Sequence, residues 1–531
     1  MRIASWLTDS LHRLGPDSTA GPRRPMVILA ARSERVSCQV GLRAIGRGDR
    51  PAEAQVACRA DEGLKVRVRR VAYVPVPHHN LPVVRGHVEG HLPGYVGDPL
   101  FDDSAAALWP GRTQAFWLTI SVSRSCRAGD RRVHVSVAAD SGVQRHTLTV
   151  RVANVTLGPR RDLPVTHWFY ADALCDWYGV RPWSARFWRI VAPYVRNVVA
   201  HGQDTLYVPV FTPPLDGVKR PTQLLKVRRA GLGRYRFDFA DVRRWVRLAA
   251  RCGIRHFEFC HLFTQWGAAR AIRIYHGQGL DAKPLWPDRT AATGPTYRSF
   301  LAQYLPALER FCRAEGIMDH SFFHLSDEPH GQAHRRNYAR ARAMLADLAP
   351  WMKIRDALSE VAFARAGLVD VPIASIRSVG EFNAAGIDCW HYFACGPRGK
   401  FLNRLMDTPL SKIRMTGWLL YRLGAKGFLH WGYNYWHRRQ TRRMIDPFTV
   451  SNALGGPGWA HGDPFEVYPG PDGPIDSVRW EVFAESLQDY ALLQHLGVDR
   501  DAALLSRLRA YDDFPFSPAW VARARAKLLG M

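Results

Sequence analysis

Lysine is scarce in this 531-residue chain: nine residues are Lys, so about 64 of the 73 basic residues are Arg. Long apolar runs are missing too, because no stretch approaches the roughly 18 residues that a membrane helix needs. The first residues, MRIASWLTDSLHRLGPDS, lack the apolar core of a signal peptide. Nine scattered cysteines form no Cys-x-x-Cys pair, which fits free thiols in a reducing compartment. We therefore expect a cytoplasmic protein without a membrane span.

The formal net charge of +26 comes from arginines spread along the whole chain. The densest basic clusters, at 67–70 and 438–443, are short. A nucleic-acid binder usually concentrates its charge in a stripe or tail and mixes Lys with Arg. Two explanations remain open, an Arg-favouring genome composition and an anionic ligand or partner. Nucleic acid is not the expected partner, although an Arg-driven binder of an anionic polymer stays a third hypothesis.

Several common catalytic motifs are absent from the sequence. We find no Gly-x-Gly-x-x-Gly nucleotide loop, no Gly-x-Ser-x-Gly elbow, no His-Glu-x-x-His zinc motif and no P-loop. His261 and His430 have no His, Cys or carboxylate at i+2 or i+4. His324 has Glu328 at i+4, but a strand end does not place that spacing on one face. The sequence therefore predicts neither a metal site nor a cofactor.

The composition and the periodicity indicate a globular protein of two parts. Residues 1–25 are expected to form a tail. Residues 26–160 alternate with period two in short runs such as QAFWLTISVS and RRVHVSVAAD, separated by turn residues, which predicts an antiparallel β-sandwich. Residues 161–531 are expected to form a catalytic domain with C-terminal helices.

Apolar strands alternate with helical patterns in the second part, which predicts a (β/α)8 barrel. An open parallel sheet is the alternative. The expected strands are 164–170, 203–210, 254–261, 319–325, 352–357, 368–375, 387–394 and 426–433. The expected helices include 185–200, 240–252, 297–315 and 332–348, and the segment 477–530 is expected to be largely helical, including 501–511.

Two adjacent acids, Asp327 and Glu328, closely follow a predicted strand and precede Pro329. In a barrel, functional residues gather where strands end at the carboxyl face. Neighbouring carboxylates repel one another, so one can stay protonated as a general acid while the other stays charged. Glycosidases use two carboxyl groups in this way, one protonated and one charged.

Aromatic and polar side chains crowd the other predicted strand ends. Aromatic rings beside amide and imidazole groups suit sugars, whose C–H patches stack while their hydroxyls form hydrogen bonds. Some of these side chains are expected to serve packing only. The candidate substrate-binding residues are His167, Tyr170, His261, Gln265, Trp266, His324, Asp356, Tyr392, Trp431, Tyr433 and Asn434.

Six segments resemble the bacterial "domain of unknown function 4091" proteins, which are related to glycoside hydrolase family 123. The similarity runs over about residues 165–495, and the preceding domain resembles the usual N-terminal domain of that family. The segments are FTPPLDG (211–217), HLFTQWGA (261–268), FFHLSDEP (322–329), DALSE (356–360), GFLHWGYNYW (427–436) and GDPFEVYPGPDGPIDSVRWEVFAESLQDY (462–490).

This resemblance implies a (β/α)8 catalytic domain and a retaining β-N-acetylgalactosaminidase-type activity that uses the 2-acetamido group of the substrate. It implies that Glu328 protonates the leaving oxygen and then activates water. Asp327 would orient the acetamido nitrogen and stabilise an oxazolinium-like intermediate. The segment AARAIRIYHGQGL departs from the family pattern by being more basic.

One feature of the sequence agrees with a nucleophile supplied by the substrate, namely the lack of a second carboxylate at the last two predicted strand ends. A conventional retaining glycosidase needs a second carboxylate about 5 Å away as nucleophile, and the last two predicted strands carry none at their ends. Asp356 is the best remaining protein nucleophile and Asp463 is a more distant one. We expect a hydrolase of a terminal β-linked 2-acetamido-2-deoxy sugar on a glycan; the alternative is a non-catalytic carbohydrate-binding protein or pseudoenzyme.

Overall fold

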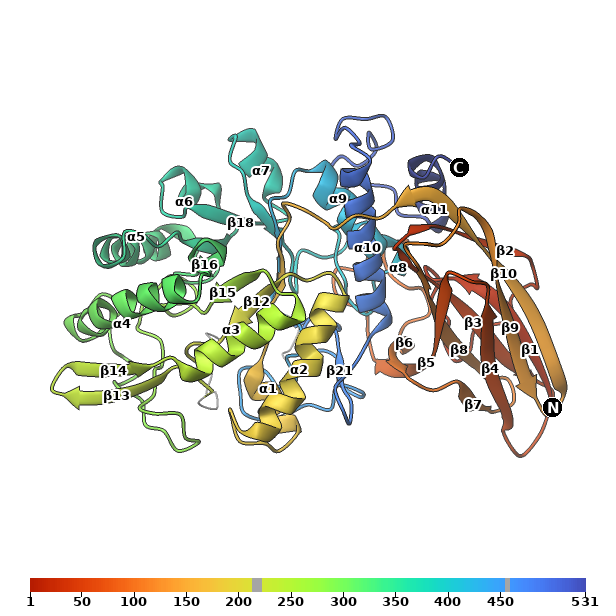
Figure 1. Cartoon of the computed structure of the whole chain (residues 1–531), viewed down its shortest axis with the longest axis horizontal. Helices are drawn as coiled ribbons and strands as arrows, with labels where there is room; N and C mark the ends of the chain where they lie inside the picture. The colour runs from red at the N-terminus through yellow and green to blue at the C-terminus, as the bar shows by residue number, and fades with distance from the viewer. Residues whose placement is uncertain (213–221, 454–458) are drawn as a thin grey trace.

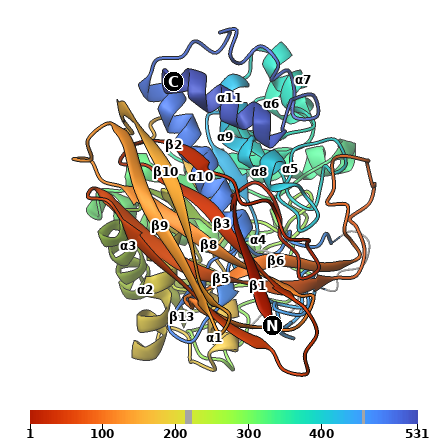
Figure 2. The same cartoon turned by 90° about the vertical axis from the view of Figure 1, so that its right-hand side faces the viewer.

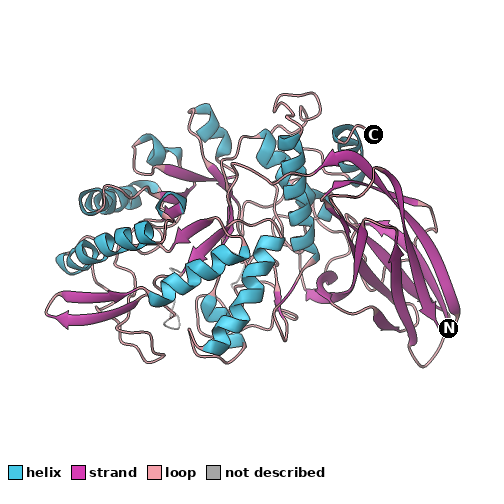
Figure 3. Ribbon diagram, viewed as in Figure 1, coloured by secondary structure: helices cyan, strands magenta, loops and turns pink. Residues whose placement is uncertain are grey.

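The computed structural model describes residues 1–212, 222–453 and 459–531. An N-terminal strand-rich domain lies beside a mixed α/β domain, and the long helix α10 (Val478–His495) runs between them (Figures 1 and 3). Residues 213–217 of the FTPPLDG segment lie outside the described residues.

The N-terminal domain contains two five-stranded sheets (Figure 2). The first has the order β1 (Arg2–Asp9), β3 (Arg35–Ile45), β8 (Thr113–Val122), β5 (Leu64–Val76), β6 (Gly94–Phe101). The second has the order β2 (Met26–Arg32), β10 (Gly142–Thr156), β9 (Gly129–Ala139), β4 (Ala52–Ala60), β7 (Ala105–Leu108). Val40 and Leu118 of the first sheet share a hydrophobic core with Val135 and Val150 of the second. The predicted antiparallel pairing is confirmed except between β2 and β10, which are parallel.

The expected tail at 1–25 is wrong for its first residues, which form β1 and pair with β3. Ile3 and Trp6 are buried in this strand. The indole of Trp6 fits against Gly41 of β3, where an added Cβ would lie 2.3 Å from the ring. Ile3 and Trp6 lie on opposite faces of the strand and Ser5 is buried, so the strand has no clean alternation of apolar and polar residues that the sequence could reveal.

In the part of the chain that the structure describes, the α/β domain contains eight parallel strands, and each predicted strand range overlaps one of them. Five form the sheet β11 (Val165–His167), β20 (Phe428–His430), β19 (Trp390–Tyr392), β18 (Val371–Ser375), β17 (Arg355–Leu358). Three form the sheet β12 (Thr205–Val208), β15 (His256–Phe259), β16 (Ser321–Phe323). A parallel bridge between Phe323 and Ile354 links the two sheets at one edge. The parallel α/β prediction is confirmed, whereas the ladders of the described residues make two curved sheets and do not establish a closed ring.

Helices follow the parallel strands along the chain. They are α1 (Ala171–Trp177), α2 (Ala185–Ala200), α3 (Ala240–Cys252), α4 (Pro295–Ala314), α5 (Gly331–Leu348), α6 (Val361–Arg365), α7 (Val379–Ala384), α8 (Leu410–Arg414), α9 (Thr416–Arg422), α10 and α11 (Pro518–Leu528), with a 3-10 turn at Met318–His320. Helices α2, α10 and α11 begin after Ser184, Ser477 and Ser517, whose side chains each accept a hydrogen bond from a backbone N–H in the first turn. Such caps satisfy amides that the helix leaves unpaired.

Two short hairpins complete the domain, β13 (Lys226–Gly231) with β14 (Arg234–Asp238), and β21 (Tyr468–Pro469) with β22 (Pro474–Ile475). The prediction of a helix within 501–511 is wrong, because the segment is a series of turns. Its apolar residues Leu505 and Leu508 are buried all the same. Burial, without a helix, therefore accounts for their spacing.

Buried ion pairs join the N-terminal domain to α10 and to the segment before it. The guanidinium of Arg69 on β5 donates to Asp476 (2.6 Å) and to Glu481 (2.8 Å). Arg479 of α10 pairs with Asp98 of β6 at 3.1 Å. All five side chains are almost completely buried. Because one partner without the other would leave an uncompensated buried charge, these pairs fix how the two domains meet.

Two features of the whole chain complete the description. All nine cysteines lie in the described part of the chain, and none is paired there. Within residues 1–212, 222–453 and 459–531, no helix combines the length and the apolar character that crossing a bilayer would require.

The close approach of α9 to α10 yields a first prediction. A Cβ at Gly417 would lie 1.8 Å from the backbone oxygen of Ser486. Gly417→Ala therefore forces two buried helices apart and should cost about 3 kcal/mol of the free energy of unfolding. Gly380→Ala is the matched control, because Gly380 is an exposed helical glycine with no atom within 4 Å of its added Cβ; it should stay within about 1 kcal/mol of the parent. Thermal unfolding of both variants measures this, and equal melting temperatures would contradict it.

Candidate active site

The loops that follow β15 and β16 run side by side past the carboxyl ends of these strands. The N–H of Phe263 donates to the carbonyl of Leu325 (2.9 Å), and the N–H of Trp266 donates to the carbonyl of Asp327 (2.8 Å). This pairing places Gln265 beside the acids, and its Nε2 donates to Oδ2 of Asp327 at 2.8 Å. Two segments about 60 residues apart in sequence are thus joined at one site.

Asp327 and Glu328 differ in their surroundings. Asp327 is 7% exposed. Its burial, followed by the neighbouring charge of Glu328, raises the pKa of Asp327 well above its ordinary value, and the hydrogen bond from Gln265 offsets only part of this. Glu328 is half-buried and accepts a hydrogen bond from the hydroxyl of Tyr392 at 2.6 Å. The pair therefore combines a dry carboxyl group with one that is partly open to solvent.

Backbone strain gathers at the same two loops. Glu328 has φ +42°, and Trp266 and Ala268 have φ +55° and +51°. A non-glycine residue in this region costs about 1–3 kcal/mol, and such residues cluster at functional sites. Gly267 between them (φ +106°) faces the ring of His334, whose Cγ would lie 2.4 Å from an added Cβ. The loops are held in one unusual conformation by their neighbours.

An aromatic cluster continues from the ends of β11 and β20. Trp431 packs against Tyr170, Tyr435 and Trp459, with ring centroids 6.4, 5.2 and 5.4 Å apart. The indole Nε1 of Trp431 donates to Asp463 at 3.0 Å. Burial raises the pKa of Asp463 to about 7. Burial, followed by the neighbouring groups Tyr435, Asp172, Asp327 and Asp463, raises the pKa of Tyr170 well above its ordinary value, so Tyr170 lies within electrostatic reach of Asp327.

Five of the predicted substrate-binding residues lie next to the acids or in this cluster. Gln265 and Tyr392 bond directly to them. Trp266 is 44% exposed beside Gln265, and Trp431 is half-buried. Tyr170 is buried within the aromatic cluster. Contact of these residues with substrate stays a prediction.

Three other predicted residues are held inside the protein by internal bonds. His167 lies between Gln203 (3.1 Å) and the guanidinium of Arg404 (2.9 Å). The hydroxyl of Tyr433 donates to Asn197 at 2.9 Å. The amide of Asn434 makes hydrogen bonds of 2.9 and 3.0 Å with the backbone of Tyr170 and so ties the end of β20 to that of β11. These placements favour a supporting role over direct contact.

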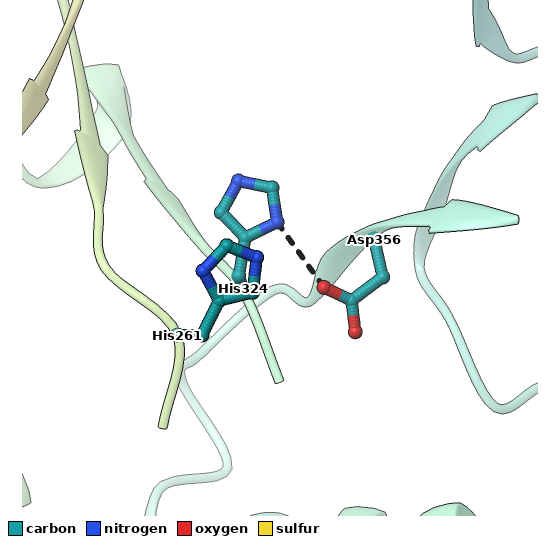
Figure 4. A group of neighbouring side chains, drawn as sticks. All are labelled: His261, His324 and Asp356. Carbon is teal, nitrogen blue, oxygen red and sulfur yellow. Dashed lines mark hydrogen bonds and ion pairs between the residues drawn. The ribbon is translucent and has the colours of Figure 1, made fainter. Parts of the chain in front are cut away.

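His261, His324 and Asp356 lie together, as Figure 4 shows, and Asp356 bonds to the backbone of Leu325 and Ser326 just before the acids. Their nearest ligand atoms lie within 4.8 Å of one another, a spacing that a metal ion could bridge. However, both ring nitrogens of His324 already face carboxylates, Asp356 at 3.1 Å and Glu258 at 2.6 Å. The rings of His261 and His324 are also stacked, 4.4 Å apart and 26° from parallel, so their lone pairs do not converge on one point. The geometry fits an ion-paired histidine better than a metal centre.

Glu258 is the member of this group that sequence reasoning missed. It lies in the middle of β15, where Phe257 and Phe259 flank it. It accepts hydrogen bonds from the indole of Trp168 (2.9 Å) and from the hydroxyl of Thr166 (2.5 Å). The sequence does contain a signal for Glu258, because it is a single acid within an apolar strand. A buried carboxylate requires polar partners, so such an acid indicates a buried polar group of several residues.

Two adjacent acids after one parallel strand, close to aromatic side chains, are compatible with the acid–base chemistry of a glycoside hydrolase. Residues 168–496 match the family model of the glycoside hydrolase 123 catalytic domain. The chain belongs to glycoside hydrolase family 123.

The solved structures agree with this assignment at the level of the fold. A family 123 glycoside hydrolase from Clostridium perfringens, studied for glycolipid glycan hydrolysis, aligns with TM-score 0.76 at 10% identity, over 100% of this chain and 97% of that one. A putative α-galactosidase from Bacteroides fragilis aligns with TM-score 0.25 at 10% identity, over 80% and 75%. A β-glucuronidase from Parabacteroides merdae aligns with TM-score 0.31 at 10% identity, over 92% and 51%. The last two similarities are too weak to support an argument. A search of curated proteins found no match.

The burial of Asp327 yields a prediction about stability. Because the pKa of Asp327 is raised in the folded protein, its ionised form destabilises the fold. This cost is absent at a pH below the ordinary value of 3.8 and grows as the pH rises from there toward the folded pKa. Asp327→Asn should therefore raise the melting temperature at pH 7 by about 2 °C or more, and by less at pH 4.5. Asp388→Asn, which alters an exposed acid paired with Lys426, should show no such gain. A melting temperature of Asp327→Asn that falls with rising pH relative to the parent would contradict the argument.

Proposed function

We propose that the chain hydrolyses a terminal β-linked 2-acetamido-2-deoxy sugar, with N-acetylgalactosamine first among candidates, by a retaining mechanism in which the substrate supplies the nucleophile. The proposal takes the eight parallel strands as a (β/α)8-type scaffold whose carboxyl ends carry the site. The observation that carries it is the buried Asp327, fixed by Gln265 next to the partly open Glu328.

The first step needs a proton donor and an internal nucleophile. The acetamido oxygen attacks C1 while the bond from C1 to the leaving oxygen breaks, and Glu328 gives its proton to that oxygen. Asp327 acts in its ionised form: the hydrogen bond that it accepts from the acetamido N–H and the positive charge that develops on the ring formed both favour the carboxylate, and they oppose the burial that raises its pKa in the free protein. In the second step Glu328 takes a proton from water, the water oxygen bonds to C1, and the bond between C1 and the acetamido oxygen breaks, which restores the acetamido group.

The state of the nearby acids supports a substrate nucleophile. Asp356 uses both oxygens on His324, Tyr338 and two backbone amides. Glu258 uses both oxygens on Trp168, Thr166 and His324. Neither carboxylate has an oxygen available to attack C1. Asp463, the other acid near the aromatic cluster, accepts the indole N–H of Trp431 through Oδ2 only, and its Oδ1 lies 3.5 Å from Nε2 of His430. Asp463 therefore stays the alternative protein nucleophile.

Aryl glycosides test the proposal. The parent should cleave an aryl β-N-acetylgalactosaminide and should leave the matching 2-hydroxy galactoside intact. Asp327→Asn and Glu328→Gln should each lower kcat about 100-fold to 10,000-fold, the range expected for lost acid–base catalysis. Glu381→Gln, an exposed acid on α7, is the matched control and should keep full activity.

Two outcomes would end the proposal. Unchanged turnover in both variants would remove the acids from the reaction. Binding of amino sugars by calorimetry without any release of sugar would instead identify a carbohydrate-binding protein on this scaffold.

A further inference from the structure

A buried row of charges lies directly under the catalytic loop. Glu258 of β15, His324 after β16 and Asp356 of β17 come from three neighbouring strands and are 2%, 1% and 0% exposed. The imidazole of His324 lies between the two carboxylates, 2.6 Å from Glu258 and 3.1 Å from Asp356 (Figure 4 draws the second contact). An imidazole that faces two carboxylates through both nitrogens is a cation that donates to each.

Asp356 connects this row to the loop. Its Oδ2 accepts hydrogen bonds from the backbone N–H of Leu325 (3.2 Å) and of Ser326 (2.9 Å), and from the hydroxyl of Tyr338 on α5. Ser326 also donates through its hydroxyl to the carbonyl of Thr264 at 2.7 Å. The peptide that leads into Asp327 is therefore held from below by one carboxylate and from the side by the neighbouring loop.

The loop needs such an anchor because Glu328 is strained. A residue at φ +42° persists only where its surroundings determine its conformation. Loss of the bonds from Leu325 and Ser326 would let the loop relax toward ordinary backbone angles, and the two acids would move from their working positions.

We propose that Glu258, His324 and Asp356 are positioning residues for the reaction given under Proposed function, on which this inference rests. The charged His324 holds Asp356 in place, Asp356 fixes the backbone before Asp327, and Glu258 completes the neutralisation of His324 and orients its ring. None of the three touches the sugar.

The electrostatics around His324 agree with this role. Burial alone lowers the pKa of His324, but the hydrogen bonds and charges of Asp356 and Glu258 outweigh it and raise the pKa to about 9. The cation also moderates the pKa of Asp327, which burial, Glu328 and Asp356 raise. The titratable or charged groups around this row come from five elements. They are Tyr207 from β12, Glu258 and His261 from β15 and its loop, Asp327 and Glu328 from the same loop as His324, Arg355 and Asp356 from β17, and Tyr338 from α5.

The test separates charge from shape. Asp356→Asn and Glu258→Gln keep the size of each side chain and remove its charge. Each should lower kcat on an aryl β-N-acetylgalactosaminide about 10-fold to 100-fold while KM changes less than about threefold, because the acids are misplaced by a fraction of an ångström but the sugar still binds. Asp370→Asn is the matched control: Asp370 also accepts a bond from a backbone N–H before β17 (Ile354, 2.6 Å) and contacts α5 through Arg342, away from the loop. It should leave kcat and its pH profile unchanged.

A direct readout of His324 makes the test independent of activity. Nitrogen NMR of labelled imidazoles in the parent should show His324 protonated at both nitrogens up to about pH 8, with a midpoint near 9. In Asp356→Asn the midpoint should fall by one unit or more. His324→Gln serves to assign the signal.

The outcomes are distinguishable. A parent that cleaves no 2-acetamido glycoside defeats the proposed function, whereas the titration of His324 still measures the charged row. An active parent with unchanged kcat in both Asp356→Asn and Glu258→Gln overturns the positioning role. A His324 midpoint near its ordinary 6.5 in the parent overturns the charged row whether or not the variants fold.

Discussion

A carboxyl group with almost no access to water stands beside a second carboxyl group at the end of β16, and the rest of the site accommodates that juxtaposition. Burial and like charge both oppose ionisation of Asp327. Three neighbours favour the charged form of these acids. Gln265 donates a hydrogen bond to Asp327, Tyr392 donates one to Glu328, and the cationic His324 lies nearby. Each of these partners comes from a different parallel strand or its loop, so the site exists only when several strands are in register.

The N-terminal domain reaches this site through a chain of polar contacts. Asp98 on β6 pairs with Arg479 of α10, which donates to the carbonyl of Gly462 at 2.7 Å. The next residue, Asp463, accepts the indole N–H of Trp431. A strand of the N-terminal domain thus supports the loop that holds Trp431 of the aromatic cluster in place. This connection gives the domain a structural role in the site, although it supplies none of the proposed catalytic groups.

Periodicity predicted the α/β domain well because its parallel strands are short apolar runs bounded by helices. The helices 185–200 and 240–252 match α2 and α3. Periodicity failed where burial occurs without a regular element, as at 501–511, and where a strand lacks a clean alternation of apolar and polar residues, as at β1. The acids were found because sequence places them after a strand. The contacts of His324 with Asp356 and Glu258 were not predicted, because these acids are 32 and 66 residues away and spacing along the chain says nothing about which strands become neighbours. Asp356 was itself a candidate site residue, whereas Glu258 was missed.

The excess of arginine over lysine has a physical explanation at several positions inside the fold. Arg69, Arg414, Arg479 and Arg525 are buried and ion-paired with carboxylates, in part through more than one nitrogen. A guanidinium keeps its charge and matches a carboxylate with two parallel bonds, whereas a buried ammonium tends to lose its proton. Lys412 shows the difference, because burial lowers its pKa to about 7. Guanidinium groups committed to internal carboxylates do not face an external polyanion, so these buried arginines argue nothing about nucleic acid.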